Sequence, residues 1–253
     1  VPGGATLPQF INIRYGRKAQ IVVSLVAIIY MSAFLVAEFA SINFLFPSIA
    51  EVSGLRIMIL VGAFTYAYLK KSGFKASYIT DKFQGIGIIL LLIVLFSIWF
   101  NQNSLTEIVN YSKLGGLGTF ETFSLKSALA VILAVTAAEI FSQGYWQRTF
   151  SAKNEKTIKK ASVISAIGAF LTILLIGVAG DVGAGKGLES PTLSFIGQLD
   201  LNLFSSVLLV SLCTLLVASS IDTLENAISS TISLDLIGKG AKEAQYITLA
   251  IIH

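Results

Sequence analysis

The sequence is poor in the residues that build disulfides, metal clusters and charged surfaces. It contains one cysteine, Cys213, and one histidine, His253, among 253 residues. A single cysteine excludes a disulfide framework within the chain, and a single histidine excludes a histidine-based metal cluster. Charged residues make up 13% of the chain, against roughly 25% in soluble domains. The sequence therefore does not predict a water-facing globular surface.

Hydrophobic residues make up 55% of the chain and are gathered in long runs. This pattern predicts an all-α, polytopic membrane protein, because about 17–25 apolar residues cross a bilayer as a helix. We expect six spans, the second being the shortest: residues 19–49, 55–70, 84–101, 124–146, 158–179 and 203–236.

Residues 1–18 are expected to form a cytoplasmic lead-in segment, and residues 237–253 a cytoplasmic loop followed by the start of a further span. The sequence lacks an initiator methionine and stops within an apolar run, so we expect a fragment of a longer chain.

Basic residues are concentrated in alternate loops between the expected spans. Fourteen of the 18 lysines and arginines fall on one side. The positive-inside rule places that side, and both ends of the chain, in the cytoplasm, and we expect the membrane to be the plasma membrane. The net charge of +4 thus reflects membrane topology and does not predict a nucleic-acid partner.

A polar stripe runs along one face of the last expected span. Its members are spaced three or four residues apart and therefore share a helical face: Ser219, Asp222, Thr223, Asn226, Ser229, Ser230 and Ser233. Such groups inside a bilayer need a partner, a water-filled cavity or an ion. Paired hydroxyls beside a carboxylate favour a cation site, and helix packing through serine and threonine is the alternative.

Other carboxylates lie within or beside the expected spans. Glu38 lies in the first span among small residues, and Glu139 lies deep in the fourth, where Ser142 and Gln143 share its face. Asp81 lies at the cytoplasmic entrance of the third span. Intramembrane acids are candidates for contact with an ion or a substrate. A structural acid at Glu38 and stabilisation of a helix dipole by Asp81 are the alternatives.

Two motifs typical of enzymes are incomplete or missing. Residues 180–186 spell GxxxxGK, but Gly187 occupies the place where a serine or threonine would hold magnesium. No GxSxG nucleophile elbow occurs in the sequence. We therefore expect neither an enzyme nor a bound cofactor.

Four segments resemble the sodium:solute symporter family in sequence, order and spacing: TLPQFINIRYG (Thr6–Gly16), ASYITDKFQ (Ala76–Gln84), SQGYWQRTFSAKN (Ser142–Asn154) and ASSIDTLENAISSTISLD (Ala218–Asp235). The resemblance implies a LeuT-like bundle of two inverted five-helix repeats, in which the six spans would be core helices three to eight. Such repeats place substrate and ion sites near mid-membrane, where a helix is broken. The broken first core helix would precede Val1.

The resemblance also implies an ion site. Ser219 and Ser220 match the hydroxyl pair that coordinates sodium in the family, and Leu216 matches the position that donates a backbone carbonyl. Asp81 matches an acid near the cytoplasmic sodium path, and we place Asp222 on the same ion pathway. Sodium as the coupling ion is the one cofactor-like group that this resemblance implies.

The expected substrate positions depart from those of sugar carriers. Glu38 falls where sugar-carrying members often have an acid, but Val135 and Ala138 stand where those members supply an asparagine and a tyrosine. Glu139 and Ser142 lie beside them. This departure argues against a hexose and favours a compact polar solute such as urea or proline. The Q-x-Y-W-Q run is more similar to the urea and polyamine branch.

The implied function is secondary active transport, in which sodium influx drives uptake of a small polar solute by alternating access. The expected partners are that solute, sodium and the lipid bilayer. A proton-coupled symporter of the same fold is one alternative, with Glu38 or Glu139 as the titrating group. A passive small-solute channel and a non-transporting membrane sensor or scaffold are the others.

Overall fold

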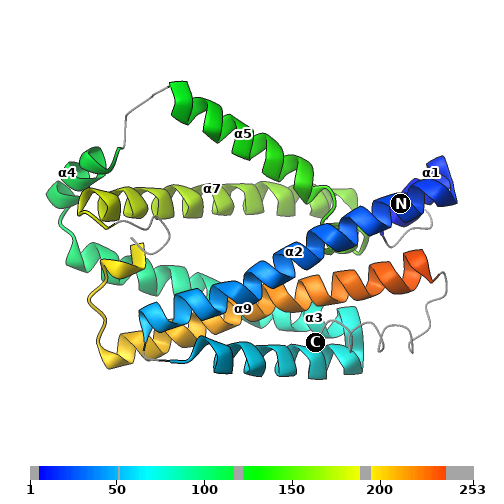
Figure 1. The fold of residues 1–253 in the computed structure, drawn as a ribbon, viewed down its shortest axis with the longest axis horizontal. Coiled ribbons are helices and arrows are strands. Elements are labelled where there is room, and N and C mark those ends of the chain that lie inside the picture. The colour runs from blue at the N-terminus through cyan, green and yellow to red at the C-terminus, as the bar shows by residue number, and fades with distance from the viewer. Residues whose placement is uncertain (1–5, 51, 117–121, 189–194, 238–253) are drawn as a thin grey trace.

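The computed structural model describes residues 6–50, 52–116, 122–188 and 195–237, without the side chains of residues 72–76 and 122–124. It confirms the all-α class. The helices are α1 (Leu7–Tyr15), α2 (Arg17–Ile49), α3 (Gly54–Gln102), α4 (Leu105–Gly115), α5 (Thr122–Glu139), α6 (Gln143–Phe150), α7 (Glu155–Gly185) and α9 (Leu203–Ser230), followed by the π-helix η1 (Thr231–Leu236) (Figure 1).

Four stretches of helix in the described part of the chain are long and apolar enough to cross a membrane: Arg17–Ile49, Ser77–Gln102, Glu155–Gly185 and Leu203–Leu236. A fifth candidate is a helix pair, Leu125–Glu139 and Gln143–Phe150, bent by 58°. The helix is therefore broken after Glu139, within the span expected at residues 124–146, and that span stays a prediction. The repeat arrangement of the LeuT-like bundle stays a prediction.

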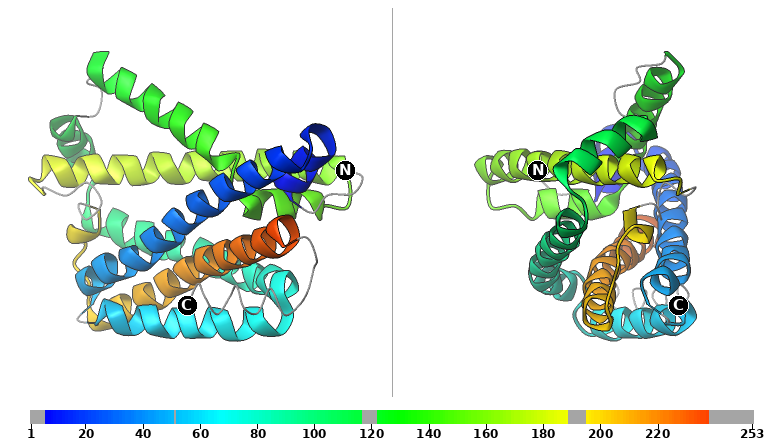
Figure 2. Two further views of the ribbon diagram at one scale, coloured as in Figure 1. Left: turned by 45° about the vertical axis from the view of Figure 1, so that its right-hand side comes forward. Right: turned by 90° about the vertical axis from the view of Figure 1, so that its left-hand side faces the viewer.

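The expected span at residues 55–70 is not among these helices, and basic residues lie at both of its ends: Arg56, Lys70 and Lys71. It belongs to α3, within which the chain turns back on itself, so that the two parts of α3 run in opposite directions (Figures 1 and 2). The expected loop and further span at residues 238–253 lie outside the described residues, as do residues 1–5 of the lead-in segment.

The core of the bundle forms where α2 and α3 pack against α9. The buried apolar residues of α2 recur at intervals of three, four or seven residues, as one face of a helix requires: Ala27, Met31, Leu35, Ile42, Phe46 and Ile49. They meet a matching set on α9: Leu209, Leu212, Val217, Ile221 and Ile228. α9 packs against α2, α3 and α6, and four of the seven members of its polar stripe are buried: Asp222, Asn226, Ser229 and Ser233.

A hydrogen-bond network ties α1 to the end of η1. The Thr6 hydroxyl donates to Asp235 Oδ1 at 2.8 Å, and Arg17 donates to the carbonyl oxygens of Asp235 and Leu236 at 2.6 and 2.9 Å. Gly16 has φ +82°, which lets the chain turn from α1 into α2 and brings Arg17 to this network. The two quoted segments Thr6–Gly16 and Ala218–Asp235 are thus in direct contact.

The short helix α4 lies beside α7 and begins with a capping box. The backbone N–H and the hydroxyl of Ser104 both donate to the Glu107 carboxylate, and these hydrogen bonds hold the pKa of Glu107 below its ordinary value. The capping box thus fixes the first residue of α4, and the helix that follows packs against α7.

Glycines allow the close approach of α4 and α7. A Cβ atom on Gly115 would lie 1.9 Å from the carbonyl oxygen of Asp181, and one on Gly185 would lie 2.0 Å from that of Tyr111. Both neighbours are backbone atoms and cannot rotate away. A side chain at either position would therefore push the two helices apart.

We expect Gly115→Ala and Gly185→Ala each to lower the free energy of unfolding by at least about 1–3 kcal/mol, the usual range for overpacking. The measurement is thermal unfolding of the full-length parent protein in detergent. Gly168→Ala on α7 is the matched control, because nothing lies within 4 Å of the Cβ it would add. Equal stability of Gly115→Ala and Gly168→Ala would contradict the close packing of α4 on α7.

Candidate functional site

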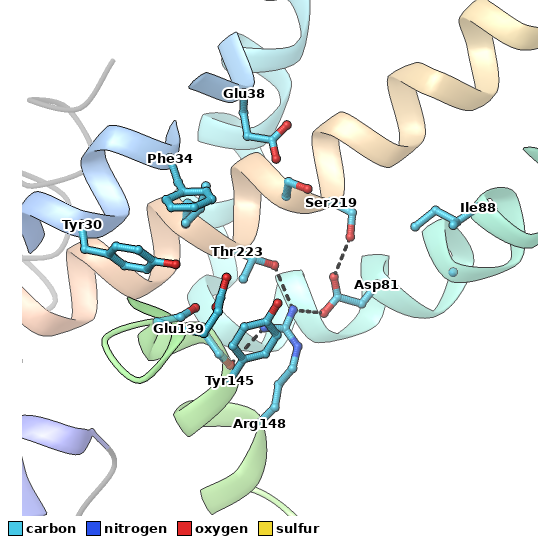
Figure 3. Close-up of a pocket in the computed structure, with 15 residues that line it drawn as sticks. Tyr30, Phe34, Glu38, Asp81, Ile88, Glu139, Tyr145, Arg148, Ser219 and Thr223 are labelled. Carbon is cyan, nitrogen blue, oxygen red and sulfur yellow. Dashed lines mark hydrogen bonds and ion pairs between the residues drawn. The ribbon is translucent and has the colours of Figure 1, made fainter. Parts of the chain in front are cut away.

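A cavity of about 500 Å³ lies between α2, α3, the bent α5–α6 pair and α9 (Figure 3). The structure brings together here six of the residues predicted from the sequence: Glu38, Asp81, Glu139, Ser142, Ser219 and Ser220. They come from four parts of the chain that are far apart in sequence. The size is suitable for a small molecule, since ligand pockets commonly hold about 300–1,000 Å³.

Four predicted residues do not line this cavity. Val135 is 53% exposed on α5, Ala138 is half-buried, and the Leu216 side chain is 38% exposed. Asp222 is completely buried on α9. The proposed contacts of Val135 and Ala138 with a substrate, and of the Leu216 carbonyl with sodium, stay predictions.

The break between α5 and α6 lies at the cavity. Glu139 is the last residue of α5, and Ser142 is the N-cap of α6. The indole N–H of Trp146 donates to the carbonyl of Ile140 at 2.7 Å, which satisfies a backbone group that the break sets free. The carboxyl-terminal end of α5 carries the negative end of the helix dipole and therefore favours a cation.

Carboxylates and aromatic rings share the cavity wall. Glu38 and Glu139 face it together with Tyr30, Phe34 and Tyr145 (Figure 3). The Tyr30 hydroxyl is a hydrogen-bond partner of Glu139. In the described part of the chain, neither carboxylate forms an ion pair with a lysine or arginine. Within the described residues, no lysine or arginine therefore balances either of these two side chains.

An ion pair joins three helices at one side of the cavity. Arg148 of α6 donates through Nη2 to Asp81 Oδ2 of α3 at 2.6 Å and to the Thr223 hydroxyl of α9 at 2.9 Å (Figure 3). The Ser219 hydroxyl donates to the other oxygen of Asp81 at 3.3 Å. Sequence reasoning did not assign a role to Arg148, although it noted the Gln-Arg run that contains it.

Asp222 is surrounded by hydroxyl donors. Its carboxylate accepts hydrogen bonds from Tyr68 and, at 3.0 and 3.1 Å, from Ser77 and Thr80, all on α3. Tyr68 precedes the reversal of α3 and the other two follow it, so Asp222 ties both parts of α3 to α9. Its place on an ion pathway stays a prediction.

The arrangement has two chemical capacities. Two carboxylates that form no ion pair among the described residues, lying beside aromatic rings, can hold an organic ammonium group through charge-assisted hydrogen bonds and cation–π contacts. The Ser219 hydroxyl, which bonds to Asp81, and the Ser220 hydroxyl in the same cavity offer oxygen ligands of the kind that a hard cation prefers. Together with the broken helix, these features define a helical membrane protein with an acidic, polar cavity.

Comparison with known proteins gives one match to report. The chain is similar to the spermidine transporter DUR31 of Candida albicans. The identity is 28% over an aligned length of 262 residues, and the alignment covers 99% of the chain. The chain spans about half of that relative's length, 49%. No protein-family model matches the chain. The similarity runs through every helix that lines the cavity.

The Arg148–Asp81 ion pair gives a prediction about stability. Arg148→Ala leaves Asp81, whose side chain is 20% exposed, without its cation, and we expect a loss of about 1–3 kcal/mol in the free energy of unfolding. Combining it with Asp81→Asn should cost less than the sum of the two single changes, because both remove one interaction. The measurement is thermal unfolding of the parent protein in detergent.

Lys159→Ala is the control for this prediction. Lys159 pairs with Glu155 at 2.9 Å, but both side chains are at least 75% exposed. An exposed pair contributes roughly 0–1 kcal/mol, so this change should be nearly neutral. Additive effects of the Arg148 and Asp81 substitutions would show that the two residues do not stabilise the protein as a pair.

Proposed function

We propose that this chain forms the cavity of a membrane transporter for a small organic cation of the polyamine class. The observation that carries the proposal is that Glu38 and Glu139, set among three aromatic rings, form no ion pair with a lysine or arginine of the described residues. The similarity to a spermidine transporter supports both the transport activity and the class of substrate. The protein is proposed to lie in the plasma membrane with both ends of this chain in the cytoplasm.

The charge of the cavity favours a polyamine over the solutes suggested by the sequence. Urea is neutral and forms no ion pair with two carboxylates, and the repulsion of proline's carboxylate would offset the attraction of its ammonium group. A polyamine carries several ammonium groups separated by methylene chains. One ammonium group can meet each carboxylate, while the methylenes lie against Tyr30, Phe34 and Tyr145.

We also propose sodium as the coupling ion, bound by the hydroxyls of Ser219 and Ser220 and the carbonyl of Leu216, with further ligands from outside this chain. The position of both hydroxyls at the cavity supports this site. Sodium bound there favours the outward-facing state, and its differential affinity for the two states couples ion flow to uptake by alternating access. Asp81 and Asp222 line the cytoplasmic exit of the ion.

The substrate class is tested by neutralising the two cavity carboxylates. We expect Glu38→Gln and Glu139→Gln each to weaken spermidine binding about tenfold or more, because a hydrogen bond to a charged group contributes about 1.5–3 kcal/mol. Uptake of labelled spermidine by the full-length parent protein in proteoliposomes is the measurement. Glu107→Gln on α4 is the control. Preferential uptake of urea or proline, insensitive to both changes, would contradict the proposal.

The coupling ion is tested by replacing external sodium with choline. We expect sodium to stimulate spermidine uptake by the parent, and Ser219→Ala with Ser220→Ala to abolish that stimulation because two oxygen ligands are lost. Ser211→Ala is the control, since that hydroxyl bonds to the carbonyl of Val207 in its own helix at 2.8 Å. Uptake that is equal in sodium and in choline but responds to a pH gradient would indicate protons as the coupling ion. Uptake that depends neither on sodium nor on the pH gradient would indicate a channel.

A further inference from the structure

The half-helix α6 is attached to α9 at three successive turns of α9. Gly144 lies so close to α9 that a Cβ atom there would be 2.7 Å from the Thr223 side chain. Arg148 donates to the Thr223 hydroxyl at 2.9 Å. The next contacts along the same face are made by Asn226, three residues after Thr223, and by Ser230, four residues after Asn226.

Gln147 makes the contact with these last two residues. Its side-chain oxygen accepts a hydrogen bond from Asn226 Nδ2 at 3.0 Å, and its Nε2 group donates to the Ser230 hydroxyl. Gln147 and Asn226 are 9% and 3% exposed, so water competes little for these bonds. One amide thus bridges α6 to two turns of α9, in a setting where a lost partner is not readily replaced.

The bridge lies between two sets of functional residues. On α9, Ser219 and Ser220 precede Thr223 by one turn and face the cavity. On α6, Tyr145 faces the same cavity two residues before Gln147. Because the bridge fixes α6 against α9, a displacement of α9 at the serines must be accompanied by a displacement of Tyr145.

We propose that Gln147 and Asn226 are positioning residues that couple ion binding on α9 to solute binding on α6. The inference rests on the proposed function, because it requires an ion at Ser219 and Ser220 and an organic cation in the cavity. Neither residue touches the ion or the solute. Their role is to make the two sites respond together.

The experiment measures a coupling factor in the full-length parent protein in proteoliposomes. This factor is the KM for labelled spermidine without sodium divided by the KM with saturating sodium. A second factor is the KM at high external pH divided by the KM at low external pH. We expect the coupling factor to fall at least about fivefold in Gln147→Ala and in Asn226→Ala, which is the lower end of usual coupling strengths. The double variant should fall no further than either single variant, because both changes remove one bridge.

Gln102→Ala is the matched control. The Gln102 side chain also uses both ends of its amide, donating to the Asp200 carbonyl at 2.7 Å and accepting from its N–H at 2.9 Å. It lies at the end of α3, outside the cavity lining, and its loss should leave the coupling factor unchanged. A purely structural role of Gln147 would lower the number of active molecules, or raise both KM values equally, without changing their ratio.

The outcomes separate this inference from the function on which it rests. Variants at Gln147 and Asn226 that keep the coupling factor of the parent would overturn the inference alone. A parent that exchanges spermidine but has a KM indifferent to sodium and to pH would overturn ion coupling and the inference together. A parent that does not exchange spermidine, measured without any ion gradient, would overturn the proposed substrate class and, with it, the inference.

Discussion

The contact of Arg148 with Asp81 and Thr223 is the point at which α3, α6 and α9 are held together. An ion pair lowers the cost of placing a carboxylate and a guanidinium inside a membrane bundle. The 58° bend after Glu139 is what allows this contact. In a straight continuation of α5, Arg148 would lie roughly 13 Å beyond Glu139 along the helix axis. The bend, the ion pair and the cavity therefore depend on one another.

The polar side of α9 combines residues that line the cavity with residues that are buried against neighbouring helices. Ser219, Ser220 and Thr223 face the cavity, whereas Asp222 and Asn226 are buried against α3 and α6. A stripe with three- and four-residue spacing is wide enough to contact both the cavity and the neighbouring helices, because its successive members are displaced around the helix axis. Packing positions and cavity-lining positions are thus neighbours on one helical face.

Much of this arrangement follows from hydropathy and periodicity. Apolar runs predicted the helical class, and carboxylates within or beside those runs made Glu38, Asp81 and Glu139 candidate site residues, which the structure gathers at one cavity. The pairing of Arg148 was not predictable, because periodicity identifies residues on one face but not the helix that the face meets. The break after Glu139 was also missed, since it depends on the Trp146 contact with the Ile140 carbonyl, and both flanks have helical composition.

The geometry around Asp81 makes the proposed sodium site compatible with the ion pair. Asp81 uses Oδ2 for Arg148 and Oδ1 for the Ser219 hydroxyl. A hydroxyl that donates its proton keeps its oxygen lone pairs free, and donation to a carboxylate makes that oxygen a better ligand. A cation at Ser219 could therefore bind without displacing Asp81 from Arg148. Its charge would be balanced by a carboxylate that one arginine already holds in position, so the three helices need not separate for the ion to enter.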